Sequence, residues 1–300
     1  MRIVAALGGN ALGRRAGTAE DPVDRGTLAH AARALAPLAA AGELIVTHGN
    51  GPQVGFLALQ AGHPGMHAAS SLDVLDAETE GWIGYLLEQA LDEALPDREV
   101  ATLLTRVEVD RNDPAFDHPD KPIGPIYHRS ECARLSAERG FQFVETGRGW
   151  RRVVPSPSPG RIVELAAIRL LVEAGVVVVC AGGGGIPVSR DPDGRQRGVE
   201  AVIDKDACSA LLAAQLDAQV LLLLTDVPGV FRDWPRPAAR PIAEVAVAEL
   251  AALRLEPGSM APKVAAACGF VRRTGGFAAI GALADAERLA NGEAGTRVRG

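Results

Sequence analysis

The stretch RIVAALGGNAL, residues 2–12, joins a short apolar run directly to a glycine turn, and this combination decides the fold. Near-continuous runs of Val, Ile and Leu are typical of strands buried on both faces, as in a parallel sheet between helices. Five similar runs follow, at 43–47 (ELIVT), 100–105 (VATLLT), 176–181 (VVVVCA), 219–225 (QVLLLLT) and 278–283 (AAIGAL). The stretches between them predict helices near 24–41, 72–95, 160–174, 205–215, 244–253 and 262–275. The sequence therefore predicts an α/β fold with a mostly parallel central sheet.

One segment, residues 111–159, interrupts this alternation. It is rich in proline, shows little sustained periodicity and is too long for an ordinary connection in a compact domain. We predict that it forms a small inserted subdomain, which projects from the sheet as a candidate lid. The chain as a whole, residues 1–300, is predicted to be a single domain.

The composition excludes several classes of protein. The net charge is −6 and no basic block is present, which argues against a nucleic-acid or membrane-surface protein. The N-terminal apolar run is too short for a signal peptide and no stretch approaches membrane length, so we predict a cytoplasmic protein. The four cysteines are far apart without a C-x-x-C pair, which predicts small buried residues and no zinc or disulfide framework: Cys132, Cys180, Cys208 and Cys268.

The predicted helix 72–95 carries two glycines, Gly81 and Gly84, one turn apart. They leave a flat strip on the helix where another element can approach closely. Two interpretations stay open at this point, a contact between subunits and packing inside the protein, because periodicity does not separate them.

Four of the predicted strands end in glycine-rich or turn-forming sequences. These are LGGNAL with Gly8, Gly9 and Asn10; THGNGPQVG with Gly49, Asn50 and Gly51; AGGGGIPV with Gly183 and Gly184; and TDVPGVF at 225–231. Open α/β sheets bind ligands beyond the carboxyl ends of their strands, and a glycine turn that opens a helix offers backbone N–H groups to an anion. None of the turns fits the dinucleotide or P-loop pattern. One such turn is often only tight geometry, but four favour a phosphate or carboxylate site.

The lysines are a second signal for a binding site. The chain has 28 arginines and only three lysines, Lys121, Lys205 and Lys263. Lysine is a compact ammonium on a thin stem, whereas arginine is a wide planar fork, so a crowded pocket accepts the first and rejects the second. Lys205 opens a predicted helix, with Asp206 beside it to hold the ammonium. Lys263 follows Gly258 and Ser259 near another helix start, and Lys121 lies in the insert. The alternative, that three lysines simply remained on the surface, is not excluded by composition.

Converging compact cations suit phosphoryl transfer, which depends mainly on positioning and on neutralising the charge of the transferring oxygens. At this point the sequence resembles the amino acid kinase family, and within it the carbamate kinase branch. The segments that carry the resemblance occur in the same order, from residue 5 to 264: ALGGNAL, VTHGNGPQVG, EVDRNDPAF, DKPIGP, GRGWRRVVPSPSP, AGGGGIPV, RGVEAVIDKD and GSMAPKV. The closing GEAGTRV resembles the last strand of the family.

The resemblance implies a three-layer αβα sandwich with a mostly parallel central sheet and a small projecting subdomain, working as a homodimer. It implies a phosphotransferase with a carboxyl group as acceptor, which converts ATP and carbamate reversibly to ADP and carbamoyl phosphate. Mg²⁺ is expected to be held mainly by the nucleotide phosphates, with no protein metal site and no covalent intermediate.

The resemblance also implies roles for individual residues. Lys205 and Lys263 would neutralise the transferring phosphoryl group, with Asp206 orienting them, and Lys121 would close on the substrate from the insert. The carbamate and phosphoryl oxygens would be cradled by Gly8, Gly9, Asn10, Gly49, Asn50, Gly51, Gly183 and Gly184. The nucleotide would lie along Thr225, Asp226, Gly258, Ser259 and Met260.

One departure from the carbamate kinase pattern is the pair Glu78 and Glu80, where many members have a neutral run. We favour a solvated or interface face of the helix over altered substrate surroundings. The alternatives to carbamate kinase are another small-molecule kinase of the family and a non-catalytic nucleotide-binding regulatory protein of the same fold. Retention of all three lysines argues against the non-catalytic reading.

Overall fold

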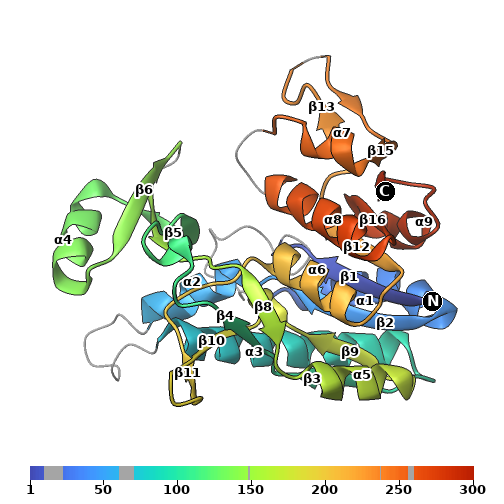
Figure 1. Ribbon diagram of the computed structural model, residues 1–300, viewed down its shortest axis with the longest axis horizontal. Helices are drawn as coiled ribbons and strands as arrows, with labels where there is room; N and C mark the ends of the chain where they lie inside the picture. The colour runs from blue at the N-terminus through green and yellow to red at the C-terminus, as the bar shows by residue number, and fades with distance from the viewer. Residues whose placement is uncertain (10–22, 61–70, 148, 237, 256–259) are drawn as a thin grey trace.

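The computed structural model of the protein describes residues 1–9, 23–60, 71–147, 149–236, 238–255 and 260–300. Its centre is an eight-stranded sheet with the strand order β15-β17-β16-β12-β1-β2-β9-β3 (Figure 1). In chain order these strands are β1 (Arg2–Leu7), β2 (Glu43–His48), β3 (Val100–Leu103), β9 (Val177–Cys180), β12 (Val220–Thr225), β15 (Glu244–Ala246), β16 (Phe277–Ala282) and β17 (Thr296–Arg299). All six predicted strands are therefore present, and β15 and β17 extend the sheet at one edge.

The central sheet is mostly parallel, as predicted. Only β16 and β17 pair antiparallel, so β15 and β17 run against the other six strands. The strand β1 shows why the apolar runs are continuous: Ile3, Ala5 and Leu7 enter one hydrophobic core, while Val4 and Ala6 enter the other. A strand buried on both faces has no polar face to alternate with.

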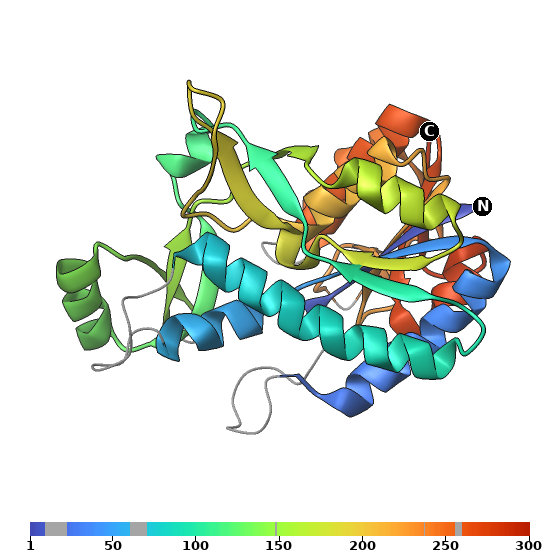
Figure 2. The same cartoon turned by 90° about the horizontal axis from the view of Figure 1, so that it is seen from below.

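Helices cover both faces of this sheet and complete the predicted three-layer αβα sandwich. On one face pack α1 (Arg25–Ala41), α3 (Leu72–Ala94) and α9 (Ala286–Ala290), and on the other α5 (Leu165–Glu173), α6 (Lys205–Gln215), α7 (Val247–Ala251) and α8 (Met260–Thr274). Figure 2 shows α3 and α5 on opposite sides of β9 and the edge strand β3.

A second sheet, which the sequence did not predict, has the order β11-β10-β4-β8. Its strands are β4 (Arg106–Val109), β8 (Pro159–Ile162), β10 (Ile186–Arg190) and β11 (Gln196–Gly198). The predicted helix 160–174 was wrong at its start, because residues 160–162 belong to β8, which pairs antiparallel with β4, and the helix begins only at Leu165. The predicted helix 244–253 was likewise wrong at 244–246, which form β15.

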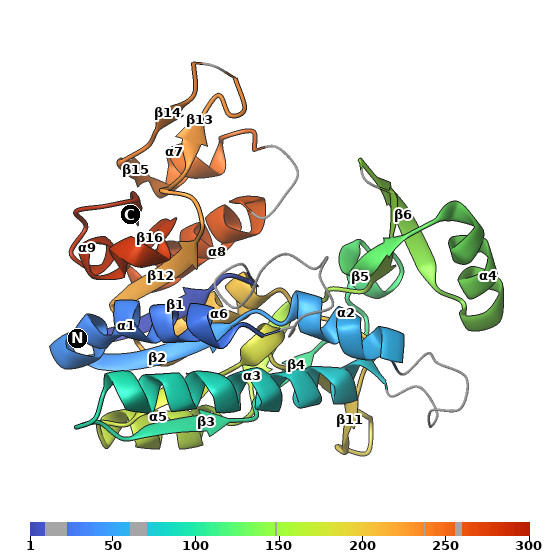
Figure 3. The same ribbon diagram turned by 180° about the vertical axis from the view of Figure 1, so that it is seen from behind.

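The segment 111–159 contains all of a separate three-stranded sheet, β5-β7-β6, and one helix. Its elements are β5 (Lys121–Tyr127), α4 (Arg129–Arg139), β6 (Gln142–Thr146) and β7 (Gly149–Val154), after a 3₁₀ turn at Pro114–Phe116. Figure 3 shows this sheet extending away from the main body beside α2 (Gly51–Gln60). A Cβ atom on Gly55 of α2 would lie 2.4 Å from the Gly124 Cα, so α2 and β5 touch backbone to backbone. The lid remains a prediction.

The remaining elements complete the chain. A short hairpin, β13 (Phe231–Arg232) with β14 (Arg240–Pro241), follows β12, and two further 3₁₀ turns lie at Gly182–Gly184 and Leu283–Asp285. All four cysteines are buried, as predicted. Among the described helices, none has the length and apolar character to cross a bilayer.

The glycine strip on α3 packs against β3 inside the protein. A Cβ atom on Gly84 would lie 2.4 Å from the Thr102 Cγ2, and the Thr102 hydroxyl donates to the Gly84 carbonyl at 3.2 Å. Gly81 has more room, because its Cβ would lie 3.8 Å from the Leu104 side chain, an ordinary contact. For Gly84 the structure therefore decides in favour of internal packing.

We expect Gly84→Ala to lose about 1–3 kcal/mol of unfolding free energy relative to Gly81→Ala, because the new methyl group overlaps the stiff Thr102 side chain. Gly81→Ala is the matched control, and we expect it to gain up to about 1 kcal/mol from the higher helix propensity of alanine. Urea denaturation of both variants and the parent measures the difference. Equal stabilities of the two variants would contradict the close packing at Gly84.

Candidate active site

The four glycine or turn sequences meet at one edge of the sheet. They follow β12, β1, β2 and β9, which are neighbours in this order and run parallel, so their carboxyl ends lie side by side. The Gly8 N–H donates to the Leu224 carbonyl at 3.0 Å, and the Gly49 N–H donates to the Leu7 carbonyl at 3.2 Å. A Cβ atom on Gly8 would lie 2.9 Å from the Leu224 oxygen, which explains why this turn needs glycine.

The three lysines converge on the start of α6. Lys205 is the first residue of this helix, and its Nζ lies 2.5 Å from Asp206 Oδ1. Lys263, in the first turn of α8, places its Nζ 2.9 Å from the other oxygen, Asp206 Oδ2. A Cβ atom on Gly49 would lie 3.4 Å from both the Lys205 Cδ and the Gly9 nitrogen, so the stem of Lys205 borders the glycine turns.

Burial makes this charge cluster strongly coupled. Asp206 and Lys263 are each 4% exposed. Burial disfavours the Asp206 carboxylate, but the ammonium groups of Lys205 and Lys263 outweigh it and lower the pKa of Asp206 to about 2. Burial, and then repulsion from Lys263, lower the pKa of Lys205, while attraction to Asp206 opposes that shift. The result is one carboxylate shared by two cations, with an excess positive charge at the strand ends.

Asp204 has a double role that the sequence analysis did not assign. Its Oδ1 accepts from the backbone N–H groups of Asp206 and Ala207 and so caps α6. Its Oδ2 accepts from Lys121 Nζ at 2.6 Å, which ties the insert to the helix start. An Asp directly before a predicted helix is an N-cap signal, and that signal was available in VIDKD.

The other predicted site residues lie at the same edge or outside the described residues. Gly51 opens α2, Gly183 and Gly184 form the 3₁₀ turn after β9, Thr225 ends β12 with Asp226 next to it, and Met260 opens α8. Asn10, Gly258 and Ser259 lie outside the described residues.

Glu80 is a correction to the sequence analysis. Glu78 is exposed, as predicted for a solvated helix face, but Glu80 is 1% exposed. Its Oε1 accepts from the Gly182 N–H at 2.8 Å and its Oε2 accepts from the Thr105 N–H at 3.1 Å. Glu80 therefore joins the turn after β9 to the end of β3. Burial raises the pKa of Glu80 to about 8, although both N–H groups oppose the shift.

His48 and Asp76 are buried beside the same turns and were also missed. Burial lowers the pKa of His48 to about 4, so its imidazole is neutral near pH 7. Its Nδ1 lies 3.2 Å from the Gly49 carbonyl. Burial likewise raises the pKa of Asp76 well above its usual range, while a hydrogen bond from Asn50 opposes this. Polar residues on an amphipathic helix are normally exposed, so no sequence signal marked Asp76 or Glu80 as buried.

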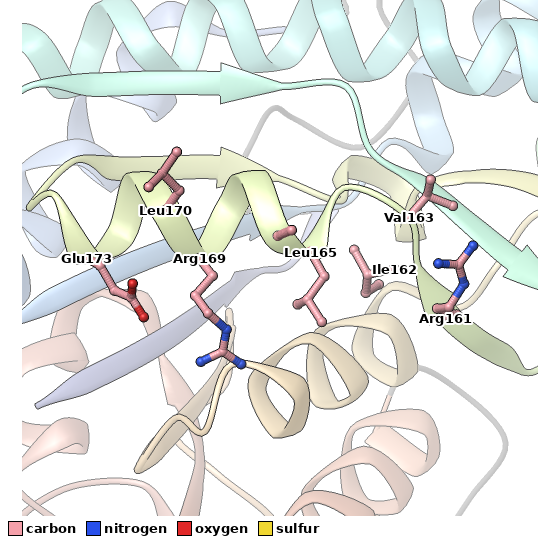
Figure 4. Close-up of a pocket in the computed structure, with 8 residues that line it drawn as sticks. Arg161, Ile162, Val163, Leu165, Arg169, Leu170 and Glu173 are labelled. Carbon is pink, nitrogen blue, oxygen red and sulfur yellow. The ribbon is translucent and has the colours of Figure 1, made fainter.

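A separate pocket of about 470 Å³ lies on the surface between β8 and α5 (Figure 4). Leu165 and Leu170 line it together with Arg161 and Arg169. Both guanidinium groups are engaged, Arg161 with Glu108 and Arg169 with Asp217. None of the three lysines or glycine turns contributes to this pocket, so it is distinct from the site at the strand ends.

The site at the strand ends offers the ammonium groups of the buried Lys263 and the partly buried Lys205, and a third ammonium from the insert, beside the glycine turns. Such fixed donors stabilise negative charge that develops on a transferring group. In the part of the chain that the structure describes, no group of three or more His, Cys, Asp or Glu residues is arranged to hold a metal ion. The arrangement is suited to binding and neutralising a polyanion.

Because Glu80 is buried, we expect the free energy of unfolding to depend on pH. Its pKa is about 8 in the folded protein against 4.5 ordinarily, so between these values the folded state holds a proton that the unfolded state has lost. Raising the pH through this window therefore destabilises the protein, by up to about 1.4 kcal/mol per pH unit. We expect Glu80→Gln to lack this contribution, so its unfolding free energy should rise relative to the parent between pH 5 and 8.

Urea denaturation at several pH values measures this difference, and Glu78→Gln is the matched control, with the same substitution at an exposed position two residues away. The control should follow the parent at every pH. Parallel pH curves for the parent and Glu80→Gln would show that Glu80 does not hold a proton in this window.

Comparisons with known proteins agree with the geometry. The model of the family described as "Amino acid kinase family" matches residues 1–280. The carbamate kinase of Rhizobium meliloti is 51% identical over 300 residues, covering 99% of this chain and 92% of the relative.

Two solved structures extend the likeness to three dimensions. A crystal structure from Aeropyrum pernix K1 has a TM-score of 0.92 at 41% identity, covering 100% of this chain and 99% of the other. The carbamate kinase from Giardia lamblia bound to AMP-PNP has a TM-score of 0.90 at 37% identity, with 99% and 98% covered. By sequence and by fold, this chain belongs to the amino acid kinase family.

Proposed function

We propose that this protein acts as a carbamate kinase, which transfers a phosphoryl group reversibly between ATP and carbamate to give ADP and carbamoyl phosphate. The observation that carries the proposal is the convergence of Lys205 and Lys263 on the buried Asp206 at the glycine-lined strand ends. The relative from Rhizobium meliloti, 51% identical over nearly the whole chain, supports the choice of carbamate among the acceptors of the family.

In this proposal the reaction needs positioning and charge neutralisation, and no activated nucleophile. Carbamate already carries an oxyanion, which attacks the terminal phosphorus of ATP in line with the leaving ADP oxygen. The ammonium groups of Lys205 and Lys263 neutralise the transferring oxygens, and Asp206 holds both in place. The Gly9 backbone N–H is assigned to the negative oxygens at the end of β1, whereas the N–H groups of Gly8 and Gly49 hold the turns through the carbonyls of Leu224 and Leu7.

The nucleotide is assigned to the carboxyl end of β12, at Thr225 and Asp226, and to the start of α8, at Met260. Gly258 and Ser259 are assigned to the same nucleotide site. The complex of the Giardia lamblia enzyme with AMP-PNP supports ATP as the phosphoryl donor. Mg²⁺ is assigned mainly to the nucleotide phosphates, where it neutralises part of their charge. Asp206, the buried carboxylate nearest the site, is already engaged by two ammonium groups, so it is not assigned as a metal ligand.

Lys121 connects the insert with the reaction site. Its contact with Asp204, next to Lys205, supports the proposal that residues 111–159 close over the substrate as a lid. A homodimer, a cytoplasmic location and the roles of the individual residues are part of the same proposal.

The test is ATP formation from ADP, Mg²⁺ and carbamoyl phosphate, with acetyl phosphate and N-acetylglutamyl phosphate as comparison donors. We expect much faster ATP formation from carbamoyl phosphate than from either comparison donor. Faster reaction with N-acetylglutamyl phosphate would indicate a different acceptor. No ATP from any donor, despite measurable ADP binding, would favour a non-catalytic protein.

The same assay tests Lys205. We expect Lys205→Ala to lower turnover by roughly 10²–10³, the usual effect of removing one preorganised donor of positive charge. Lys205→Arg should also lose most activity, because the wide guanidinium does not fit where the thin stem of lysine passes Gly49. The reverse exchange at an exposed helix position, Arg33→Lys, is the control and should keep full turnover. Near-normal turnover of Lys205→Ala would exclude the assigned role.

A further inference from the structure

The Asn50 side chain lies between the glycine turn after β9 and the buried face of α3. Its Nδ2 donates to Asp76 Oδ1 at 2.9 Å and to Thr79 Oγ1 at 3.0 Å. All three residues are buried, with exposed fractions of 2% or less. Asn50 sits directly between Gly49 and Gly51, in the turn that borders Lys205.

The partners on α3 decide which way the Asn50 amide points. The Thr79 hydroxyl lies 2.9 Å from the Leu75 carbonyl and 3.0 Å from the Asp76 carbonyl, so its proton is used within the helix and it offers Asn50 a lone pair. Asp76 Oδ1 offers a lone pair when the carboxyl is ionised, and also when a proton resides on Oδ2. Two acceptors therefore face Nδ2, and the flipped amide would place its carbonyl oxygen against them.

This orientation leaves the Asn50 carbonyl oxygen free for another donor. Among the described residues no hydrogen bond reaches Asn50 Oδ1. A Cβ atom on Gly183 would lie 2.1 Å from Asn50 Nδ2 and 2.7 Å from Oδ1, so the amide as a whole packs against the glycine turn after β9. Lys205 and Lys263 bring ammonium groups to the strand ends, and these bind the anionic oxygens of a ligand. The Asn50 carbonyl oxygen is an acceptor, so it suits a hydrogen-bond donor of the ligand instead.

We propose that Asp76 is a specificity-determining positioning residue, which with Thr79 fixes the Asn50 amide so that its carbonyl oxygen accepts a hydrogen bond from the amino group of the carbamoyl substrate. This inference rests on the proposed function and deepens it. The carbamoyl amino group carries two N–H donors, whereas the methyl group of an acetyl substrate carries none. A flipped amide would instead present Nδ2–H to the substrate amino group, donor against donor.

The test compares two phosphoryl donors in the ATP-forming reaction, carbamoyl phosphate and acetyl phosphate. Asp76→Leu removes one acceptor at Nδ2, and Thr79→Val removes the other without changing the shape of the side chain. We expect kcat/KM for carbamoyl phosphate to fall roughly 10- to 100-fold in Asp76→Leu, the scale of one lost hydrogen bond at a buried site. The value for acetyl phosphate should stay within about twofold. The ratio of the two donors is therefore the readout, and Thr79→Val should shift it in the same direction.

Asp73→Asn is the matched control, because it removes a carboxylate one helical turn away that does not contact Asn50. It should leave the ratio unchanged. A purely structural role of Asp76 lowers the rates with both donors together, and an unchanged ratio in Asp76→Leu and Thr79→Val would overturn the inference. A parent protein that forms no ATP from carbamoyl phosphate would instead overturn the proposed function.

Discussion

The two ion pairs of Asp206 are the interaction on which the site depends. The Asp206 carboxylate pairs with Lys205 of its own helix, α6, and with Lys263 of α8. Without this carboxylate, each ammonium would be a costly unpaired charge in the interior. Removing it would leave two ammonium groups unpaired in the interior, a loss of roughly 3–5 kcal/mol for a buried pair. The same carboxylate therefore fixes the relative position of α6 and α8 and concentrates positive charge at the end of the sheet.

The sheet brings the remaining parts to this charge. Because β12, β1, β2 and β9 are adjacent and parallel, four turns from distant parts of the sequence meet beside Lys205. Asp204 adds the connection to the insert, since it caps α6 with one oxygen and binds Lys121 with the other. Beneath the turns, Glu80 and Asp76 on α3 hold the backbone at Gly182 and the amide of Asn50. The site is thus built from backbone turns that buried side chains hold in place.

The sequence predicts the elements and site residues that a short stretch of the chain, or its composition, is enough to identify. The strand at 219–225 is recognisable because burial on both faces leaves only Val and Leu at 220–224. The lysines stand out because arginine fills the other 28 of the 31 Lys and Arg positions. The second sheet was missed because strands such as β4 and β11 are short and polar, and because β4 pairs only with the distant strands β10 and β8. Glu80 was assigned to the surface because a carboxylate on a helix is normally exposed, and its burial depends on Gly182 and Thr105 far along the chain.

The most direct test of this account is the titration of the lysine ammonium groups. With three lysines in the chain, selective ¹⁵N labelling of lysine side chains gives three Nζ signals, which single Lys→Arg variants assign. The account predicts that the pKa of Lys205 lies below the ordinary lysine value, because of burial and Lys263, and that it falls further in Asp206→Asn. A Lys205 signal that titrates like that of an exposed lysine, and is unchanged by Asp206→Asn, would contradict the central role of Asp206.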